Sequence, residues 1–439
     1  MNRKVFTLIL LSFLAQIGIS QDFDGNKLDS YFDALEKNNK FMGSVGLSKN
    51  GQIIYTKQVG YLDVAAKIKP DSFTKYRVGS ISKTFTTVLV FKAIEEKRLT
   101  LTDKIDQYFP AILNASKITI GNLLNHRSGI RSFTAAADYL AWNTQKKSEK
   151  ELVDIIVKGG SDFEPDSKAE YSNSNFVLLS FILQNIYQKS YAQLLTEKIT
   201  EPLGLKNTYF GKVTNPKDNE SFSYSFSGAW TKEVETDASI PMGAGAVVSS
   251  PSDLVKFADA LFKAKLVSNQ SLELMKTIKD GYGLGLFRVP FGNKFGYGHN
   301  GAIDGFSSVM YHFADEDVVV AMISNGSNYD NNQISIALLS SVYNKSYEIP
   351  SFSAYKVTNE DLDSYLGGYA SPQMPLKITI TKNNNTLVAQ ATGQSAFALE
   401  ATQKDTFKFD QAGIVLEFNP ATKSMVLKQG GKTFNFVKE

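Results

Sequence analysis

The sequence predicts an α/β fold of the α+β kind: an antiparallel sheet flanked by helices with a helical subdomain, followed by a small C-terminal all-β barrel. Two observations predict it. Strand-like runs stand at both ends of the first 350 residues, with mainly helical sequence between them. Beyond Pro350 come short, often alternating apolar runs separated by turn residues, as in small β modules.

The N-terminal segment predicts export. Arg3 and Lys4 give a basic start, residues 5–19 are mostly apolar, and Gly18 and Ser20 are small residues at the −3 and −1 positions of a cleavage site. We therefore expect residues 1–20 to be a signal peptide, the mature protein to be periplasmic or extracellular, and no membrane span to remain. The chain has no cysteine, so its core must suffice without disulfides.

The next elements are a helix, a hairpin and a second helix. Residues 26–38 carry apolar side chains at helical spacing. Asn50-Gly51 stands between the apolar runs 43–48 and 52–55, which is a strong hairpin signal. A further helix is expected to start at about Ser80.

Residues 94–240 favour helices joined by polar loops. Thr119 is the expected cap of a helix that ends at Ser128-Gly129, and residues 176–186 form an apolar helical run. Beyond this region, a helix within 249–263 is expected to be capped by Ser252.

Strands dominate from there. Expected strands span 282–287, 295–299, 306–311 and 318–323, and a helix over 333–343 can cover the sheet. Six short runs predict the barrel, at 376–380, 386–389, 406–409, 414–418, 424–427 and 432–437. We therefore expect a first domain over 21–350, a linker over 351–360 and a β-barrel domain over 361–439.

Ser80 and Lys83 form the first candidate chemical pair. They are three residues apart, about one helical turn. At a helix N-terminus, free N–H groups and the helix dipole stabilise negative charge on a serine oxygen, and a nearby lysine can serve as its base. The alternative is a structural serine cap beside a solvated lysine, because Ser-x-x-Lys alone is common.

Two later segments add polar side chains. Tyr171-Ser172-Asn173 lies in a loop directly before a buried helix, where side chains can point into a cleft. Helix capping by Ser172 or Asn173 is the alternative, and it is favoured when the segment is taken alone. His299, on a predicted strand, precedes Gly301, and a glycine lets the backbone come close to a ligand.

In this order, Ser-x-x-Lys, Tyr-x-Asn and His-x-Gly make a rare combination. Residues 26 to about 345 resemble the serine β-lactamase and penicillin-binding-protein superfamily in its class C-like branch. The stretches that carry the resemblance are 78–83, 123–129, 171–173, 202–205 and 298–301. The segment from about Leu366 resembles the lipocalin-like β-barrel appended to some members.

The resemblance implies a serine hydrolase that works through an acyl-enzyme, with no cofactor and no metal. Ser80 would be the acylated nucleophile, Lys83 its base and Tyr171 a proton relay. Asn173 would hold the substrate amide. The backbone N–H groups of Ser80 and Ala302 would form the oxyanion hole.

His299 and Gly301 complete the implied substrate-binding set. His299 takes the place of the lysine that class C β-lactamases carry in Lys-Thr-Gly. A histidine is only partly charged near pH 7, so it suits the carboxylate of a β-lactam less well. Asp166 is a second departure, because it stands where the family often has a glycine.

The implied substrate is a small molecule or peptide: a D-amino peptide, a β-lactam or an ester. We expect amide or ester hydrolysis, as by a D-alanyl-D-alanine carboxypeptidase, a D-amino-peptide hydrolase or an esterase; a true β-lactamase is the alternative. A non-catalytic binder of cell-wall peptides is the rival of another class. The presence of Ser80, Lys83 and Tyr171 argues against that rival.

Composition argues against other classes. A formal net charge of +3 without a long basic run gives no sign of a nucleic-acid partner. The Gly-x-Ser-x-Gly elbow of α/β-hydrolases is absent from the sequence. Three histidines and no cysteine argue against a metal hydrolase. Of these, His126 is expected to be structural, because a protonated or donating imidazole suits the free carbonyls of a helix C-terminus.

Overall fold

The computed structural model describes residues 23–352, 355, 357–383, 386–394 and 396–439. The predicted signal peptide, residues 1–20, lies outside the described residues, as does part of the predicted linker. Within the described ranges, no helix combines the length and the apolar character that a membrane crossing requires.

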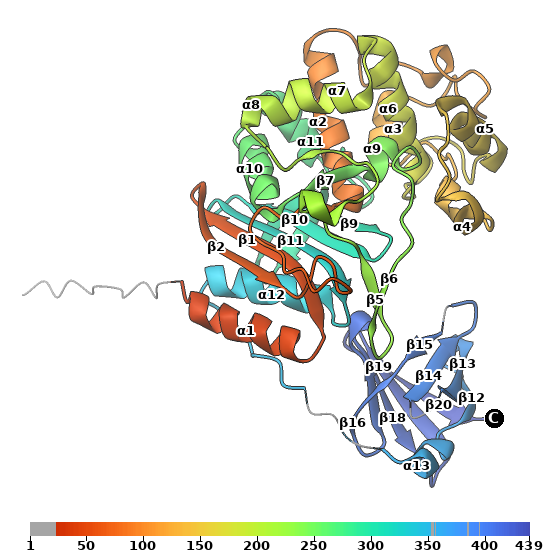
Figure 1. The fold of residues 1–439 in the computed structure, drawn as a ribbon. Coiled ribbons are helices and arrows are strands. Elements are labelled where there is room, and N and C mark those ends of the chain that lie inside the picture. The colour runs from red at the N-terminus through yellow and green to blue at the C-terminus, as the bar shows by residue number, and fades with distance from the viewer. Residues whose placement is uncertain (1–22, 353–354, 356, 384–385, 395) are drawn as a thin grey trace, which may run out of the picture.

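A six-stranded antiparallel sheet forms the centre of the first 350 residues (Figure 1). In spatial order its strands are β2 (Gln52–Val59), β1 (Phe41–Lys49), β11 (Val318–Ser327), β10 (Phe306–Phe313), β9 (Lys294–Ile303) and β8 (Phe287–Phe291). The predicted hairpin is confirmed. Asn50 and Gly51 both adopt positive φ, +54° and +75°, in the two-residue turn between β1 and β2.

Helices cover both faces of this sheet. They are α1 (Gly25–Lys37) and α12 (Asn331–Val342) on one face, and α2 (Ser82–Glu95) and α10 (Pro251–Phe262) on the other. Val320 of β11 packs with α1 and α12, whereas Val319 packs with α2 and α10. Successive residues of β11 enter opposite cores because side chains alternate along a strand.

The remaining helices of the first 350 residues form a layer beside α2 (Figure 1). They are α3 (Ile120–Leu124), α4 (Tyr139–Trp142), α5 (Glu149–Gly159), α6 (Asn173–Tyr187), α7 (Tyr191–Leu195), α8 (Glu201–Leu203), α9 (Met242–Gly245) and α11 (Asn269–Lys276). The Thr119 cap is confirmed, because its hydroxyl accepts from the Asn122 N–H at 3.0 Å. The helix it caps ends at Leu124 rather than at Ser128-Gly129, since His126 already has a φ of +59°.

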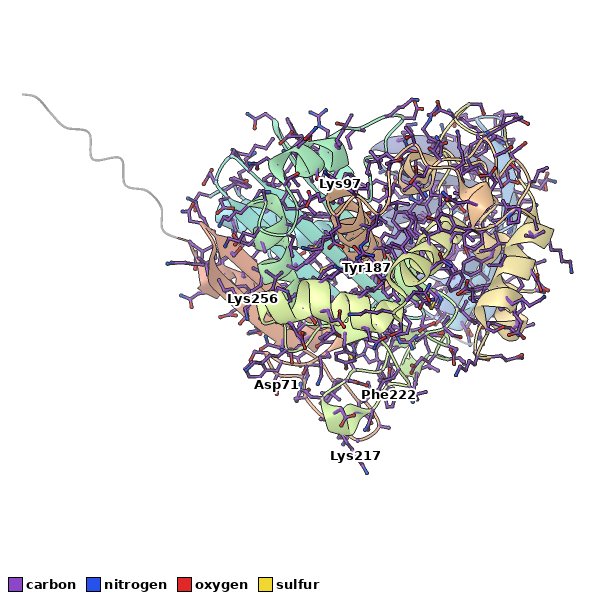
Figure 2. The ribbon with its side chains drawn as sticks, turned by 90° about the horizontal axis from the view of Figure 1, so that it is seen from above. Asp71, Lys97, Tyr187, Lys217, Phe222 and Lys256 are labelled. Atoms are coloured by element: carbon purple, nitrogen blue, oxygen red, sulfur yellow. The ribbon has the colours of Figure 1, made fainter. Side chains whose placement is uncertain are left out.

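Short strands complete this part of the chain. β3 (Tyr76–Arg77), β7 (Val247–Ser249) and β4 (Tyr209–Phe210) form a small sheet, and β5 (Tyr224–Phe226) pairs with β6 (Trp230–Lys232). Seen from above, Asp71 in the loop after β2 lies on the same side as Lys217 and Phe222 (Figure 2). The Asn219 side chain ties the two loops together by donating to the Asp71 carboxylate at 2.7 Å.

Three further local predictions need correction. The α-helix near Ser80 starts at Ser82, after a 3-10 turn over Gly79–Ile81. Ser250 caps α10 instead of Ser252, because Pro251 takes the first helical position, where its missing N–H costs nothing.

The third correction concerns residues 282–287, which form a strand only from Phe287 onward. Gly285 has a φ of +67°, and a Cβ there would lie 1.9 Å from the Thr87 hydroxyl. Its carbonyl accepts from the Thr84 hydroxyl at 3.0 Å. Gly285 therefore serves a close approach to α2 rather than a sheet.

The C-terminal segment forms the predicted barrel. Its nine strands, among the described residues, lie in the order β15 (Phe397–Ala398), β14 (Thr386–Ala391), β13 (Met374–Asn383), β12 (Gly367–Ser371), β20 (Lys432–Lys438), β19 (Ser424–Gln429), β18 (Ile414–Asn419), β17 (Thr406–Phe409) and β16 (Glu400–Gln403). The end strands β15 and β16 are adjacent in the chain, so the sheet is nearly closed. A helix, α13 (Asn359–Asp363), precedes the barrel and begins inside the predicted linker.

Polar contacts join the barrel to the first part of the chain. The buried Lys40 ammonium donates to Glu400 and, at 3.1 Å, to Asp410, two barrel carboxylates. The Gln411 side chain donates to the Ser327 carbonyl at the end of β11. These contacts lie near the β5–β6 hairpin, which extends toward the barrel (Figure 1).

We predict that truncation after Pro350 leaves a soluble, folded protein, because both cores that flank the six-stranded sheet lie before this residue. Lys40 would exchange its two carboxylate partners for water. Circular dichroism and labelling by a small neutral ester should both match the full chain. A truncated protein that is folded but not acylated would show that the barrel helps to build the site.

Candidate functional site

Two glycines bring Ser80 against the central sheet. A Cβ on Gly79, whose φ is +52°, would lie 2.8 Å from the backbone of Ala302, and a Cβ on Gly301 would lie 2.9 Å from the Ser80 nitrogen. No other residue type fits this approach. The turn that holds Ser80 therefore rests on β9, close to the backbone of Ala302.

The Lys83 amine lies at the centre of the site. Its Nζ is 2.8 Å from each of three oxygens: Ser80 Oγ, Asn173 Oδ1 and the Ala244 carbonyl. These partners come from the turn before α2, from α6 and from α9. The side chain is fully buried, and its Nζ lies 4.8 Å from the ring centroid of Tyr171.

This environment favours an uncharged lysine. Burial lowers the pKa of Lys83 well below its usual range. Among the described residues, no carboxylate pairs with it to offset that burial. A neutral amine has two N–H donors and one lone pair. It can donate to the two carbonyl oxygens and accept the proton of the Ser80 hydroxyl.

Tyr171 is held beside this pair by His126. The ring centroids of Tyr171 and His126 are 4.4 Å apart, and His126 Nδ1 accepts from the Ser172 N–H at 3.1 Å. Burial raises the pKa of Tyr171, and its hydrogen bond with Ser80 opposes that rise. Tyr171 is therefore a neutral phenol that can pass a proton to or from Ser80.

His126 is structural, as expected, but for a different reason. Burial lowers the pKa of its ring well below the usual range, so the ring is neutral and accepts a backbone N–H instead of donating to helix carbonyls. The capping alternative for the Tyr-x-Asn segment does not hold for Ser172. Its hydroxyl is buried and makes no cap hydrogen bond.

Asn173 is the first residue of α6, and both ends of its side-chain amide are engaged. Its oxygen accepts from Lys83, and its nitrogen donates to the Thr134 hydroxyl at 3.1 Å. Its backbone N–H donates to the Ser132 hydroxyl at 3.2 Å. Asn173 thus fixes the position of the Lys83 amine while exposing one edge to the cavity beside Ser80.

The expectation that His299 is partly charged near pH 7 is wrong. The side chain is buried, and burial lowers its pKa to about 3; any positive charge on Lys83 lowers it further. Its Nδ1 donates to the Asn300 carbonyl, and its ring lies 4.5 Å from that of Phe287. His299 offers a neutral imidazole and no charge for a carboxylate.

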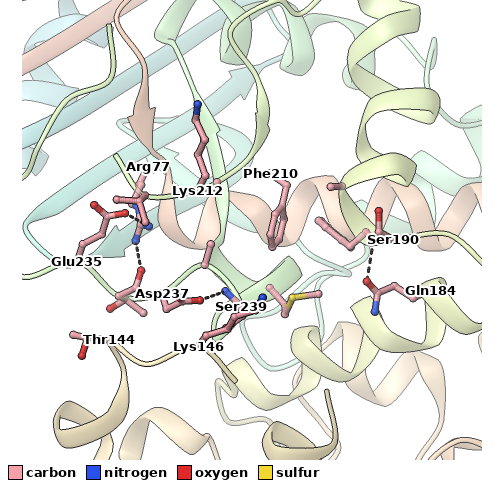
Figure 3. A pocket seen from close by; sticks show the side chains of 17 residues that line it. Arg77, Thr144, Lys146, Gln184, Ser190, Phe210, Lys212, Glu235, Asp237 and Ser239 are labelled. Carbon is pink, nitrogen blue, oxygen red and sulfur yellow. Dashed lines mark hydrogen bonds and ion pairs between the residues drawn. The ribbon is translucent and has the colours of Figure 1, made fainter. Parts of the chain in front are cut away.

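A cavity of about 650 Å³ opens beside Ser80. Asn173, Ala244 and Ala302 line it, together with apolar and polar residues of the segments 133–144 and 233–245. A second cavity, of about 810 Å³, adjoins it through Thr144 and Thr236 (Figure 3). Because the first cavity contains Ser80, the predicted nucleophile, it is the candidate substrate site.

Sequence reasoning missed two parts of this site. The Ala244 carbonyl could not be found by side-chain type, because a backbone oxygen is available at every residue. Glu233 lines the cavity with Ser80, but it follows a short strand that carried no motif. Asp166, in contrast, does occupy a position that suits glycine, with a φ of +65°.

Known proteins resemble this chain over most of its length. Residues 28–340 match the family model described as Beta-lactamase. Penicillin-binding protein 4* of Bacillus subtilis is 25% identical over 440 residues, covering 92% of this chain and 96% of that protein. Teichoic acid D-alanine hydrolase of Staphylococcus aureus is 26% identical over 325 residues, covering 72% of this chain and 78% of that protein.

A solved structure also resembles this chain in its fold. The D-amino acid amidase of Ochrobactrum anthropi, complexed with L-phenylalanine amide, superposes with a TM-score of 0.62 at 26% identity. The superposition covers 73% of this chain and 99% of that one.

We predict that the NMR signals of the His299 ring do not titrate between pH 8 and pH 5, because its pKa is about 3. An unperturbed histidine titrates near pH 6.5. With three histidines in the chain, the variant His299→Gln assigns the signal. A midpoint near pH 6.5 would restore a charged His299 and overturn the buried, neutral description.

Burial of a neutral His299 also sets the sign of a stability effect. Between about pH 6.5 and pH 3 the unfolded chain binds a proton at this residue and the folded chain does not, so stability falls as pH falls. The same variant should therefore lose less stability between pH 7 and pH 5 than the wild type. If thermal melts show that the wild type and the variant lose equal stability between pH 7 and pH 5, this assignment is contradicted.

Proposed function

This chain belongs to the beta-lactamase family, and we propose that it cleaves amide or ester bonds of D-amino acid compounds through an acyl-enzyme on Ser80. Family membership and the relatives make it a serine hydrolase. The observation that carries the proposal is the fully buried Lys83 amine, 2.8 Å from the Ser80 oxygen.

Acylation starts with the proton of Ser80. The neutral Lys83 amine takes it as Ser80 Oγ attacks the substrate carbonyl carbon. The N–H groups of Ser80 and Ala302 bind the oxyanion that forms, and Gly301 gives them room. The carbon–nitrogen or carbon–oxygen bond then breaks, and the leaving group receives a proton through Tyr171.

Deacylation runs the same relay in reverse. Water attacks the ester formed with Ser80 and gives up a proton to the group formed by Lys83 and Tyr171. Ser80 Oγ leaves as the free hydroxyl and recovers its proton. Asn173 holds the Lys83 amine in place during both halves and presents its cavity edge to the substrate amide.

The names of two relatives support the choice of substrate. One is a teichoic acid D-alanine hydrolase and the other a D-amino acid amidase. Within the proposed class, a D-amino-peptide hydrolase or an esterase fits better than a β-lactamase or a D-alanyl-D-alanine carboxypeptidase. The neutral His299 supplies no charge for the carboxylate that the latter two substrates carry. We propose that His299 contacts substrate through its uncharged ring.

The cellular setting belongs to the same proposal. We propose that residues 1–20 direct export to the periplasm or the cell exterior and that the mature chain divides into a catalytic domain over 21–350 and a barrel domain over 361–439. The separate apolar core of the barrel, which includes Tyr369 and Phe436, supports this division.

We predict that Ser80→Ala lowers turnover by on the order of 10⁴-fold or more and abolishes labelling by a fluorophosphonate or a fluorescent penicillin. Ser82→Ala is the matched control. Ser82 is buried and accepts from the Val247 N–H at 3.0 Å, so its loss should cost about 1–3 kcal/mol of stability while activity persists. Equal loss of activity in two folded variants would defeat the assignment.

We predict that Lys83→Ala and Tyr171→Phe each lower kcat/KM by roughly 10²- to 10⁴-fold, and that the double variant is little worse than the poorer single one. The two side chains share one proton path through Ser80, so removing either breaks it. Steady-state kinetics on a neutral ester gives the measurement. Losses that multiply would mean that the two residues act independently.

A further inference from the structure

We propose that Glu233 binds the free ammonium group of the substrate, so that the enzyme selects aminoacyl esters or amides whose amino group is unblocked. The inference rests on the proposed function and narrows the substrates to those that carry a positively charged amino group. The juxtaposition that carries it is an unpaired carboxylate in the same cavity as the nucleophile Ser80.

The charged residues that line the cavity are all acidic among the described residues. Glu233 and Asp304 are the charged residues among the described lining residues, and no lysine, arginine or histidine stands among them. A substrate carboxylate would therefore meet only negative charge. A substrate ammonium would meet an opposite charge in a cavity that is partly shielded from water.

Asp304 is already neutralised. Arg77 pairs with it at 3.2 Å, and Thr236 donates to it through its hydroxyl at 2.7 Å and its N–H at 3.1 Å. Arg77 is itself buried, and it also pairs with Glu235 at 2.5 Å, as Figure 3 shows in the adjoining cavity. This arginine is therefore not available to a substrate carboxylate.

Glu233 has no such partner. Within the described part of the chain, its carboxylate makes no hydrogen bond and no ion pair. The neighbouring Lys232 points elsewhere, because its ammonium lies over the ring of Phe222 at 3.1 Å from the centroid. Glu233 is half-buried, so its side chain remains accessible from the cavity that it lines.

The backbone holds Glu233 in place. Its N–H donates to the Ser223 carbonyl at 2.8 Å, and the Ser223 hydroxyl accepts from the Gly305 N–H at 3.1 Å. A Cβ on Gly305 would lie 3.0 Å from the Glu233 side chain. Glu233 is thus packed against the β9–β10 turn, three residues beyond Ala302, and it lines the same cavity as Ser80 and Ala302.

The other charged candidates near Ser80 do not oppose this assignment. Burial lowers the pKa of both Lys83 and His299 and so disfavours a positive charge on either side chain. The rest of the lining includes the apolar side chains of Phe133, Leu140 and Ile303. The cavity therefore fits an amino acid with an apolar side chain and a protonated amine.

The test compares three forms of one substrate on the full chain. D-phenylalanine p-nitroanilide carries an ammonium, its N-acetyl form is neutral, and its N-succinyl form is anionic. The wild type should prefer them in that order. Glu233→Gln should lower kcat/KM for the ammonium form by about 10- to 100-fold, the worth of a charge-assisted hydrogen bond, and leave the N-acetyl form within about twofold.

Two further variants make the result decisive. Glu233→Lys should reverse the order and favour the N-succinyl form. Glu201→Gln, an exposed carboxylate on α8 outside the cavity, should change nothing. Release of p-nitrophenol from p-nitrophenyl acetate reports Ser80 chemistry in every variant, without involving an ammonium.

The outcomes separate the two claims. If the wild type does not hydrolyse p-nitrophenyl acetate, the proposed hydrolase function itself is contradicted. Two results would overturn the role of Glu233 alone, provided that this ester is turned over normally. In the first, the wild type shows no preference for the ammonium form. In the second, Glu233→Gln affects the ammonium and N-acetyl forms equally.

Discussion

The site depends on the burial of one amine. Lys83 Nζ has three oxygen neighbours at 2.8 Å and, among the described residues, no carboxylate partner. Burying a charged ammonium there carries a large desolvation cost. The neutral amine has two donors and one lone pair, so it can form one hydrogen bond with each of its three neighbours. The turn before α2 and the helices α6 and α9 each place one of those neighbours around this nitrogen.

The sheet supplies the second half of the site. β9 can reach the Ser80 turn only because Gly79 and Gly301 lack side chains, and this contact brings the backbone of Ala302 close to the Ser80 turn, where we propose the oxyanion hole. Most of the charged residues in and around the cavity are neutralised. Arg77 is paired with Glu235 and Asp304, and burial disfavours a charge on Lys83 and His299. Glu233 is then the unpaired charged residue of the described cavity lining.

Local sequence signals predicted most of the fold. Asn50-Gly51 and Thr119 specify their turn and cap through their own backbone and side-chain chemistry, and the structure has both. Where tertiary contacts decide, the predictions failed. Gly285 serves an approach to α2 rather than a strand. His299 was assigned an ordinary pKa because burial is a property of the fold, and Ala244 contributes a backbone oxygen that no motif marks.

The most direct test of this account is the protonation state of Lys83. With ¹³C-labelled lysine, the Cε signal that disappears in Lys83→Met can be followed by NMR as the pH is raised. The account predicts that this amine is already neutral at pH 7 in the folded protein, well below the usual lysine midpoint near 10.4. A Lys83 signal that remains that of a charged ammonium up to pH 9 would contradict the account.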